Sequence, residues 1–283
     1  MTSGIRAGYL RRLGITDPGT PSAEGLFALQ RAHLERVPYE NLDIQLGRPP
    51  GIDPELSARR IAAGRGGYCF HLNGAFGLLL EALGYEVTRH VGGVMQRAEA
   101  HRRDVSGDHL ALTVRVDGQE YLVETGLGDG PYEPLPLRAG AYERGGTTYR
   151  LEESAPDAAP GWTYLNDGAS APVMNFLRAP ASTADFEAEH TRLSTSEDSG
   201  FVRTCALLRR DEHGVDALRG RVLSRVEPGK PVSERELTSP EEFFDVIASV
   251  FDRKLDDFTP ADRSALWTRV SRAHESWLAS RRG

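Results

Sequence analysis

The chain has 283 residues, 39% of them apolar, which is enough for two or three packed layers or small domains and excludes a fibrous or disordered protein. Its net charge of −7 arises from 41 acidic and 34 basic residues with no Lys/Arg-rich block, so nucleic acid is not an expected partner. The sequence has no signal-peptide core and no run approaching the ~18 apolar residues of a membrane span, so we expect a cytoplasmic protein without membrane association.

Residues 1–85 are predicted to form a small helical domain. Residues 22–36 carry apolar side chains at helical spacing and precede a proline. A second helix is expected over 53–63, because an aspartate N-cap is followed by a proline at the first helical position. A third, more apolar helix is expected over 69–84, where a glycine supplies a natural end.

Residues 86–200 change to β character. A strand is expected over 85–96, and 109–125 are predicted to form a hairpin whose two-residue turn is Asp117-Gly118. Glycine and proline punctuate short strand-like segments over 131–179. The middle of the chain is therefore predicted to be a compact sheet or barrel.

Residues 201–283 are predicted to form a mixed α/β domain, which gives the whole chain an α+β fold class. One or two strands are expected after about Phe201, and Ser239-Pro240 and Thr259-Pro260 each open a helix with a start like a capping box. Cys205 lies in a strand-like run, where we expect a small buried hydrophobe.

Cys69 has a different setting, in the segment RGGYCFHLN of residues 65–73. A cysteine at the first turn of a helix faces unpaired N–H groups and the positive end of the helix dipole, which favour a thiolate. The preceding Gly66 and Gly67 are expected to let the chain turn sharply and to leave the sulfur accessible. These features make Cys69 a candidate nucleophile, although most free cysteines are simply buried.

A cysteine nucleophile needs a base, and the base needs a group that orients it. With Asp117-Gly118 as the hairpin turn, Ala111 lies opposite Glu124 and His109 lies opposite Gly126. His109 and Glu124 are then diagonal neighbours on one face of the hairpin, roughly 7–8 Å apart at the backbone. Glu124 can accept a hydrogen bond from one ring nitrogen while the other faces a thiolate, provided that the register does not slip.

Other histidines are weaker candidates for the base. His71 lies two residues from Cys69 on the same predicted helix, so their side chains diverge. His90 lies on the predicted strand before the hairpin and is a further rival. His101 and His109 flank two aspartates, but this loop spacing is unspecific and no metal-binding motif accompanies it, so no metal is expected.

The stretch Gly126-Leu127-Gly128-Asp129-Gly130 follows the second hairpin strand. It is neither a P-loop nor a dinucleotide-binding fingerprint, and by itself it is typical of a surface turn. Beside an active site, backbone without side chains could admit a bulky cofactor such as a nucleotide diphosphate.

Four segments resemble the arylamine N-acetyltransferases in order and spacing. The segment around Cys69 is the most specific of them, and weaker similarity extends over most of the chain. The four segments are RVPYENL (36–42), RGGYCF (65–70), HLALTV (109–114) and LVETGLG (122–128). The resemblance implies an N-terminal helical bundle, a β-barrel-like domain and an α/β lid, in the cysteine-protease-like superfamily.

The resemblance also implies roles for individual residues. Cys69 would be the nucleophile, His109 the base and Glu124 the orienting carboxylate. The cysteine would take an acetyl or other short acyl group from acetyl-coenzyme A in a ping-pong cycle and pass it to an aromatic amine, hydroxylamine or hydrazine. Gly126, Leu127 and Gly128 would lie near the coenzyme A diphosphate.

Three positions depart from the family's usual residues. Glu124 stands in place of an aspartate, so its longer side chain must fold back or its strand must shift. His71 stands in place of a glutamate near the helix start, and Leu127 in place of a phenylalanine beside the acyl and arylamine pocket. Glu124 can orient His109 only if its carboxylate still reaches the imidazole. The departures at His71 and Leu127 leave the choice of acceptor amine open.

Three other functions stay open. The first is a natural-product amide synthase that takes a longer acyl chain from a carrier-protein thioester. The second is a non-catalytic protein that binds aromatic amines. The third is hydrolysis or peptide-bond cleavage by the same Cys-His-carboxylate arrangement, since fold analogy alone does not fix the chemistry.

Overall fold

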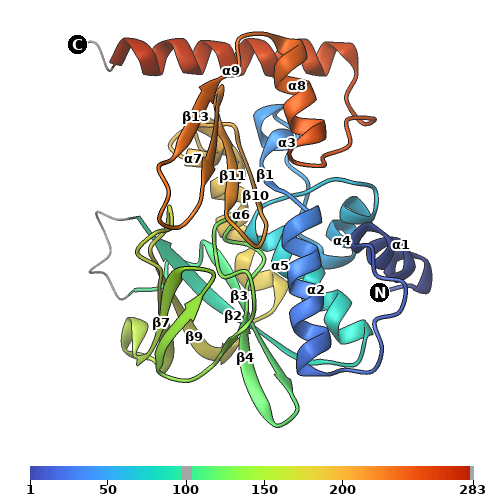
Figure 1. Ribbon diagram of the computed structural model, residues 1–283, viewed down its shortest axis with the longest axis vertical. Coiled ribbons are helices and arrows are strands. Elements are labelled where there is room, and N and C mark those ends of the chain that lie inside the picture. Colours follow the sequence, from blue (N-terminus) through green and yellow to red (C-terminus); the bar gives the residue numbers. More distant parts are fainter. Residues whose placement is uncertain (97–103, 281–283) are drawn as a thin grey trace.

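The computed structural model describes residues 1–96 and 104–280. Its N-terminal part is a group of helices (Figure 1). The helices expected over 22–36, 53–63 and 69–84 are present, and a further one precedes them. The helices of this part are α1 (Ser3–Leu13), α2 (Ala23–Arg36), α3 (Leu42–Gln45), α4 (Pro54–Ala62) and α5 (Cys69–Ala82).

The middle of the chain forms an antiparallel eight-stranded sheet that curls into a nearly closed barrel, as the sequence predicts. Its spatial order is β5-β4-β3-β2-β9-β8-β7-β6. The strands are β2 (Glu86–Met95), β3 (His109–Val116), β4 (Gln119–Val123), β5 (Leu135–Pro136), β6 (Gly140–Arg144), β7 (Thr147–Ser154), β8 (Gly161–Leu165) and β9 (Val173–Pro180), with short 3₁₀ turns at Pro156–Ala158 and Thr183–Phe186.

The last part of the chain packs helices against a five-stranded sheet of order β1-β10-β11-β12-β13 (Figure 1). Four of these strands follow residue 205, where the sequence predicts one or two. The elements are β1 (Tyr39–Glu40), β10 (Ala206–Arg210), β11 (Val215–Arg219), β12 (Val222–Val226), β13 (Ser233–Glu236), α6 (Glu187–Thr195), α7 (Gly200–Arg203), α8 (Pro240–Ser249) and α9 (Pro260–Ser280).

The strand expected to start at Phe201 begins later. Ser199 caps a short helix, α7, by accepting a hydrogen bond from Phe201 N at 3.2 Å, and β10 starts only at Ala206. The two predicted caps of the C-terminal helices are present: Ser239 accepts from Glu242 N at 3.2 Å, and Thr259 accepts from Asp262 N at 3.1 Å. No helix in the described part of the chain is long and apolar enough to cross a membrane.

The predicted hairpin register is confirmed. Val116 pairs with Gln119 and Arg115 with Glu120 on either side of the turn. Leu110 and Val123 are on the face that packs against α5, whereas Ala111 belongs to the core inside the eight-stranded sheet. The hairpin therefore places alternate residues of β3 against α5 and inside the barrel.

The segment Tyr39-Glu40-Asn41 connects the N-terminal helices to the C-terminal sheet. Tyr39 pairs with Leu208 of β10, so an N-terminal segment forms the edge of that sheet. Glu40 is buried and forms an ion pair with buried Arg253 at 3.2 Å. The division of the chain into domains at residues 85 and 200 stays a prediction. Strand β1 comes from the first of these domains but pairs with β10 in the last.

Candidate active site

Cys69 is the first residue of α5 and is only 3% exposed. Its Sγ lies 3.4 Å from the backbone oxygen of Asp108, at the entry to β3. The N–H groups of Cys69 and Phe70 belong to the first helical turn, where the backbone has no intrahelical acceptor. They are therefore placed to receive negative charge that develops near the sulfur.

Gly66 and Gly67 are required for close packing. Neither has the positive φ that a sharp glycine turn would need. A Cβ on Gly66 would lie 2.0 Å from the Pro38 carbonyl oxygen, and one on Gly67 would lie 2.6 Å from His71 Cβ. These glycines therefore hold the chain against its neighbours in front of Cys69. The expectation that they leave the sulfur accessible stays a prediction.

His109 and Glu124 are in contact inside the protein. Nε2 of His109 lies 2.8 Å from Oε2 of Glu124, and both side chains are almost completely buried. With Nε2 engaged, Nδ1 is the ring nitrogen that remains for the hydrogen bond between His109 and Cys69. The structure thus brings together the three side chains that the sequence singles out.

Burial and neighbouring charges act on this pair in opposite directions. Burial raises the pKa of the Cys69 thiol above its ordinary value of 9.0, against the hydrogen bond and positive charge of His109, which lower it. Burial lowers the pKa of His109, but the charge of Glu124 and hydrogen bonds to Cys69 and Glu124 outweigh it and raise that pKa from 6.5 to about 10. The helix start alone therefore does not yield a thiolate, which depends on the imidazolium beside it.

The additional methylene of Glu124 is accommodated by folding back. Its Oε1 accepts hydrogen bonds from Gly126 N at 2.6 Å and from Asn73 Nδ2 at 2.8 Å. Asn73 also donates to Leu110 O at 2.7 Å and accepts from Thr125 N at 2.9 Å. The carboxylate is thereby held from several sides with one oxygen left for the imidazole.

Asn73 and Gln30 were not identified from the sequence. Gln30 accepts from the Glu124 N–H at 3.2 Å and donates to Pro131 O at 2.9 Å. A signal for Asn73 exists, because it is a buried amide one helical turn after Cys69 in an otherwise apolar stretch. Gln30 carries no comparable signal in a helix rich in polar residues.

Neither His71 nor His90 lines the cavity that contains Cys69. His71 is neutral, since burial and the nearby His190 lower its pKa to about 3. Its Nδ1 accepts from Tyr68 N at 3.4 Å, so it fills the place of a capping-box glutamate without the charge. His90 bonds to Thr113 Oγ1 at 2.9 Å.

His101 lies outside the described residues. Within residues 1–96 and 104–280, no group of three or more His, Cys, Asp or Glu side chains could hold a metal ion.

The glycine-rich loop lies directly beside Cys69. A Cβ on Gly126 would lie 2.8 Å from Cys69 Cα, so only glycine fits beside the helix start. Gly128 has a φ of +78° and packs against Leu208. Leu127 lies between them and lines the cavity that contains Cys69.

A cavity of about 650 Å³ surrounds the sulfur. Its volume is within the usual range of small-molecule sites, about 300–1,000 Å³. The lining comes from segments far apart in the sequence, among them Tyr39, Cys69, Asp108, His109, Gly126, Leu127, Phe201, Arg203, Leu208 and Arg219. This arrangement has the components that cysteine-dependent acyl transfer requires: a thiol, an imidazole beside it, a carboxylate in contact with the imidazole and space for a substrate.

Known proteins share this fold and about a third or less of its residues at matched positions. The sequence profile of the N-acetyltransferase family matches residues 22–259. The arylamine N-acetyltransferase of Mycolicibacterium smegmatis is 31% identical over 264 residues, covering 91% of this chain and 95% of that protein. Proansamycin X synthase of Amycolatopsis mediterranei is 30% identical over 253 residues, covering 86% and 95%.

A solved structure gives the same result. The arylamine N-acetyltransferase of Mycobacterium marinum in complex with CoA superposes with a TM-score of 0.84 at 26% identity, over 94% of this chain and 98% of that one. The chain therefore belongs to the arylamine N-acetyltransferase family, and it is an enzyme of the acyltransferase class.

Proposed function

We propose that the protein moves an acetyl or other short acyl group from coenzyme A, through a thioester on Cys69, to an arylamine, hydroxylamine or hydrazine. The contact of His109 with both Cys69 and Glu124, beside a helix start and inside a cavity, carries this proposal. The reaction needs a reduced thiol, so we place it in a reducing compartment such as the cytoplasm.

In the first half-reaction, Cys69 and His109 start as a thiolate–imidazolium pair, and the sulfur attacks the carbonyl carbon of the donor thioester. A new carbon–sulfur bond forms, and the carbonyl oxygen becomes an oxyanion that faces the N–H groups of the first turn of α5. The bond to the coenzyme A sulfur then breaks, and this sulfur leaves as a thiol with the proton from His109. Glu124 stabilises the imidazolium throughout.

In the second half-reaction, the acceptor nitrogen attacks the acyl-Cys69 carbonyl. The nitrogen gives up a proton to His109 as the new carbon–nitrogen bond forms, and Cys69 leaves as a thiolate beside the imidazolium. The two half-reactions use one base in turn, which is the structural basis of a ping-pong cycle.

The donor is proposed to be acetyl-coenzyme A, with Gly126, Leu127 and Gly128 beside it. The Mycobacterium marinum relative is named as a complex with CoA, which supports a coenzyme A donor here. Gly126 and Leu127 line the cavity next to Cys69. Leucine at 127 provides an aliphatic surface for the acyl or aryl group.

A second candidate is an amide synthase that takes a longer chain from a carrier-protein thioester. The observation that favours it is the similarity to proansamycin X synthase, whose identity of 30% is close to the 31% of the Mycolicibacterium smegmatis arylamine N-acetyltransferase. Overall similarity therefore does not separate the two donors.

Intact-mass measurement after incubation with acetyl-, propionyl- and malonyl-coenzyme A tests the proposal. We expect one acyl group on wild-type protein, none on Cys69→Ala, and loss of the group when an arylamine is added. No adduct from any coenzyme A thioester would contradict it and favour the carrier-protein donor. Release of the free acid without an amine would instead indicate hydrolysis, and an unreactive thiol would indicate a binding protein.

A further inference from the structure

Asp108 brings a second carboxylate, besides that of Glu124, to the catalytic cavity. It immediately precedes His109 in the sequence and lines the cavity that contains Cys69. Its backbone oxygen lies 3.4 Å from the Cys69 Sγ, so the residue is a direct neighbour of the sulfur. Neither of the two half-reactions above uses its side chain.

Hydrogen bonds from the protein hold the Asp108 carboxylate in place. Oδ1 accepts from Val94 N at 2.9 Å, and Val94 itself lines the catalytic cavity. Ser106 contributes a further hydrogen bond through its side chain. An ionised carboxylate can accept about four hydrogen bonds, so these two leave part of its capacity unused. The carboxylate is thus fixed beside the cavity wall without being fully satisfied by the protein.

The negative charge of Asp108 is not neutralised by a partner. Within the described part of the chain Asp108 forms no ion pair, and the imidazole of His109 is already paired with Glu124. Burial raises the pKa of Asp108 above its ordinary value of 3.8, but hydrogen bonds and the charge of His109 oppose this change. Burial is also the main reason that the pKa of the Cys69 thiol is raised, and the charge of Asp108 raises it further. A charge that acts on the sulfur also acts on a group that becomes bonded to the sulfur.

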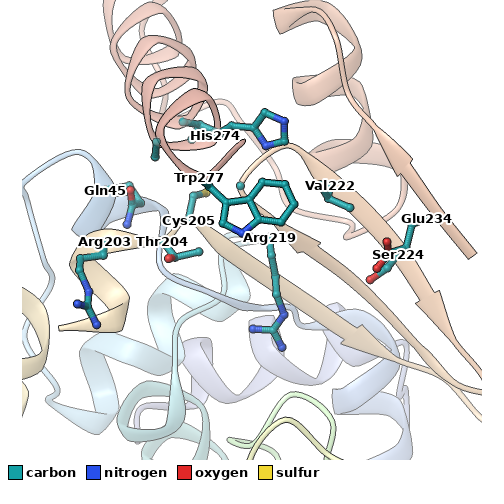
Figure 2. A pocket seen from close by; sticks show the side chains of 13 residues that line it. Gln45, Arg203, Thr204, Cys205, Arg219, Val222, Ser224, Glu234, His274 and Trp277 are labelled. Atoms are coloured by element: carbon teal, nitrogen blue, oxygen red, sulfur yellow. The ribbon is translucent and has the colours of Figure 1, made fainter. Parts of the chain in front are cut away.

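The two arginines of the catalytic cavity occupy a different part of it. Arg203 and Arg219 also line a neighbouring cavity of about 430 Å³ between α9 and the five-stranded sheet (Figure 2). Arg203 ends α7 and Arg219 ends β11. Cys205 belongs to the wall of the neighbouring cavity and is buried, as the sequence predicts. The catalytic cavity therefore has its arginines where it meets this neighbour, and a carboxylate beside the sulfur.

We propose that Asp108 is a specificity-determining residue that excludes negative charge from the position next to the thioester. An acyl group that ends in a carboxylate, such as malonyl, would bring a second anion toward Asp108 as its bond to the sulfur forms. An acceptor amine with a carboxylate beside its reacting nitrogen would do the same. Like charges repel more strongly in a partly buried site than in water. This inference rests on the proposed function and adds that both substrates are uncharged at this position.

Two alkylating reagents test the charge effect without any acyl transfer. Iodoacetamide and iodoacetate react with Cys69 in the same way, since the sulfur displaces iodide, and they are similar in size, but only iodoacetate is an anion. We expect Asp108→Asn to raise the ratio of the iodoacetate rate to the iodoacetamide rate by about 10-fold. Asp108→Glu keeps the charge and should stay within about 2-fold of the wild-type ratio. A change in the thiol pKa affects both reagents equally, so it cancels in the ratio.

Asp198→Asn is the matched control. Asp198 is an exposed aspartate between α6 and α7, and it does not line the catalytic cavity. Its substitution removes the same charge from the protein, and solvent screens an exposed charge, so the ratio should stay within about 2-fold of the wild type. An unchanged ratio in Asp108→Asn, or an equal rise in Asp198→Asn, would overturn the inference.

Two acyl donors extend the test to the proposed reaction. Malonyl- and isovaleryl-coenzyme A have acyl groups of similar shape, of which only malonyl carries a charge. Asp108→Asn should raise the acylation rate with malonyl-coenzyme A relative to isovaleryl-coenzyme A by about 10-fold, and Asp198→Asn should not. If the alkylation ratio changes as expected but no coenzyme A thioester acylates Cys69, the charge selection stands and the proposed function fails. If Cys69 is acylated and Asp108→Asn changes neither ratio, the charge selection fails and the proposed function stands.

Discussion

His109 on β3 and Glu124 directly after β4 meet at 2.8 Å, and the charge of Glu124 is the largest influence that raises the pKa of the imidazole. The contact depends on the register of one hairpin, since a slip by one residue would turn Glu124 to the other face. The carboxylate is itself fixed by Asn73 and Gly126. The two-residue turn at Asp117-Gly118 thus determines whether His109 and Glu124 meet.

The activity of Glu124 variants should depend first on the charge of the side chain at this position and then on its length. Glu124→Gln keeps the shape but removes the charge that holds the imidazolium, so we expect a loss of about 10²- to 10⁴-fold in acylation rate. Glu124→Asp keeps the charge on a shorter side chain and should lie between Glu124→Gln and the wild type. Stopped-flow release of coenzyme A measures the rates, and a fully active Glu124→Gln would show that the orienting role is wrongly assigned.

Thiol reactivity should depend on His109 and on pH. Because the pKa of His109 is raised to about 10, the ring is charged at neutral pH and loses its proton as the pH rises through that value. In His109→Ala the hydrogen bond and positive charge that lower the pKa of Cys69 are lost, so the pKa of the buried thiol rises further and alkylation at pH 7 should slow by about 100-fold or more.

Iodoacetamide alkylation followed by peptide mass measurement gives this rate at each pH. The difference between the two proteins should shrink as the pH rises through about 10, where the wild-type imidazole loses its proton. Equal rates at pH 7 would show that His109 does not influence the sulfur. Cys205, with a pKa of about 12, serves as an internal control that should stay unmodified at neutral pH.

Gly126 should not tolerate a side chain. In Gly126→Ala the new Cβ would lie 2.8 Å from Cys69 Cα and 2.9 Å from Asn73 Nδ2, so the loop or the helix start must move. We expect a loss of at least about 100-fold in acylation, since a shift of 1 Å at a reacting group has this cost. Gly51→Ala is the control, because a Cβ there meets nothing within 4 Å. Unchanged kinetics in Gly126→Ala would contradict the close contact.

The Glu40–Arg253 pair should be important for stability. Both side chains are buried, and Glu40 also accepts from Gly66 N at 3.2 Å, which links the pair to the segment before Cys69. Glu40→Gln removes a negative charge that balances the buried Arg253 guanidinium. It should lower the free energy of unfolding by about 3 kcal/mol. Urea denaturation checks this value.

Glu55→Gln provides the control for this experiment, because its ion pair with Arg59 is on the surface. We expect a change within about 0.5 kcal/mol there. A similar small change in Glu40→Gln would show that the buried pair does not stabilise the fold.

The sequence predicted the features that local rules determine. The hairpin register followed from Asp117-Gly118, and the caps of α8 and α9 followed from Ser239 and Thr259. Helix α1 was missed because Gly4 and Gly8 weaken its helical pattern and only three of its residues are buried. The start of β10 was misplaced because Ser199 caps a helical turn that strand-like side chains conceal.

Features that depend on tertiary packing were not predictable in the same way. The reason for Gly66 and Gly67 lies in the Pro38 carbonyl and the His71 side chain, which reach them only in the folded chain. The raised pKa of Cys69 comes from burial, whereas its place at a helix start predicted the opposite. Tyr39 pairs with Leu208, which is far away in the sequence. No local sequence pattern predicts this pairing.

Release of coenzyme A in a single turnover without an amine tests the central claim most directly. The account predicts a rapid burst of one coenzyme A per Cys69, no further release, and acetyl-amine formation when an arylamine is added afterwards. Absence of a burst, or continuous release of coenzyme A with free acetate and no acylated Cys69, would contradict it.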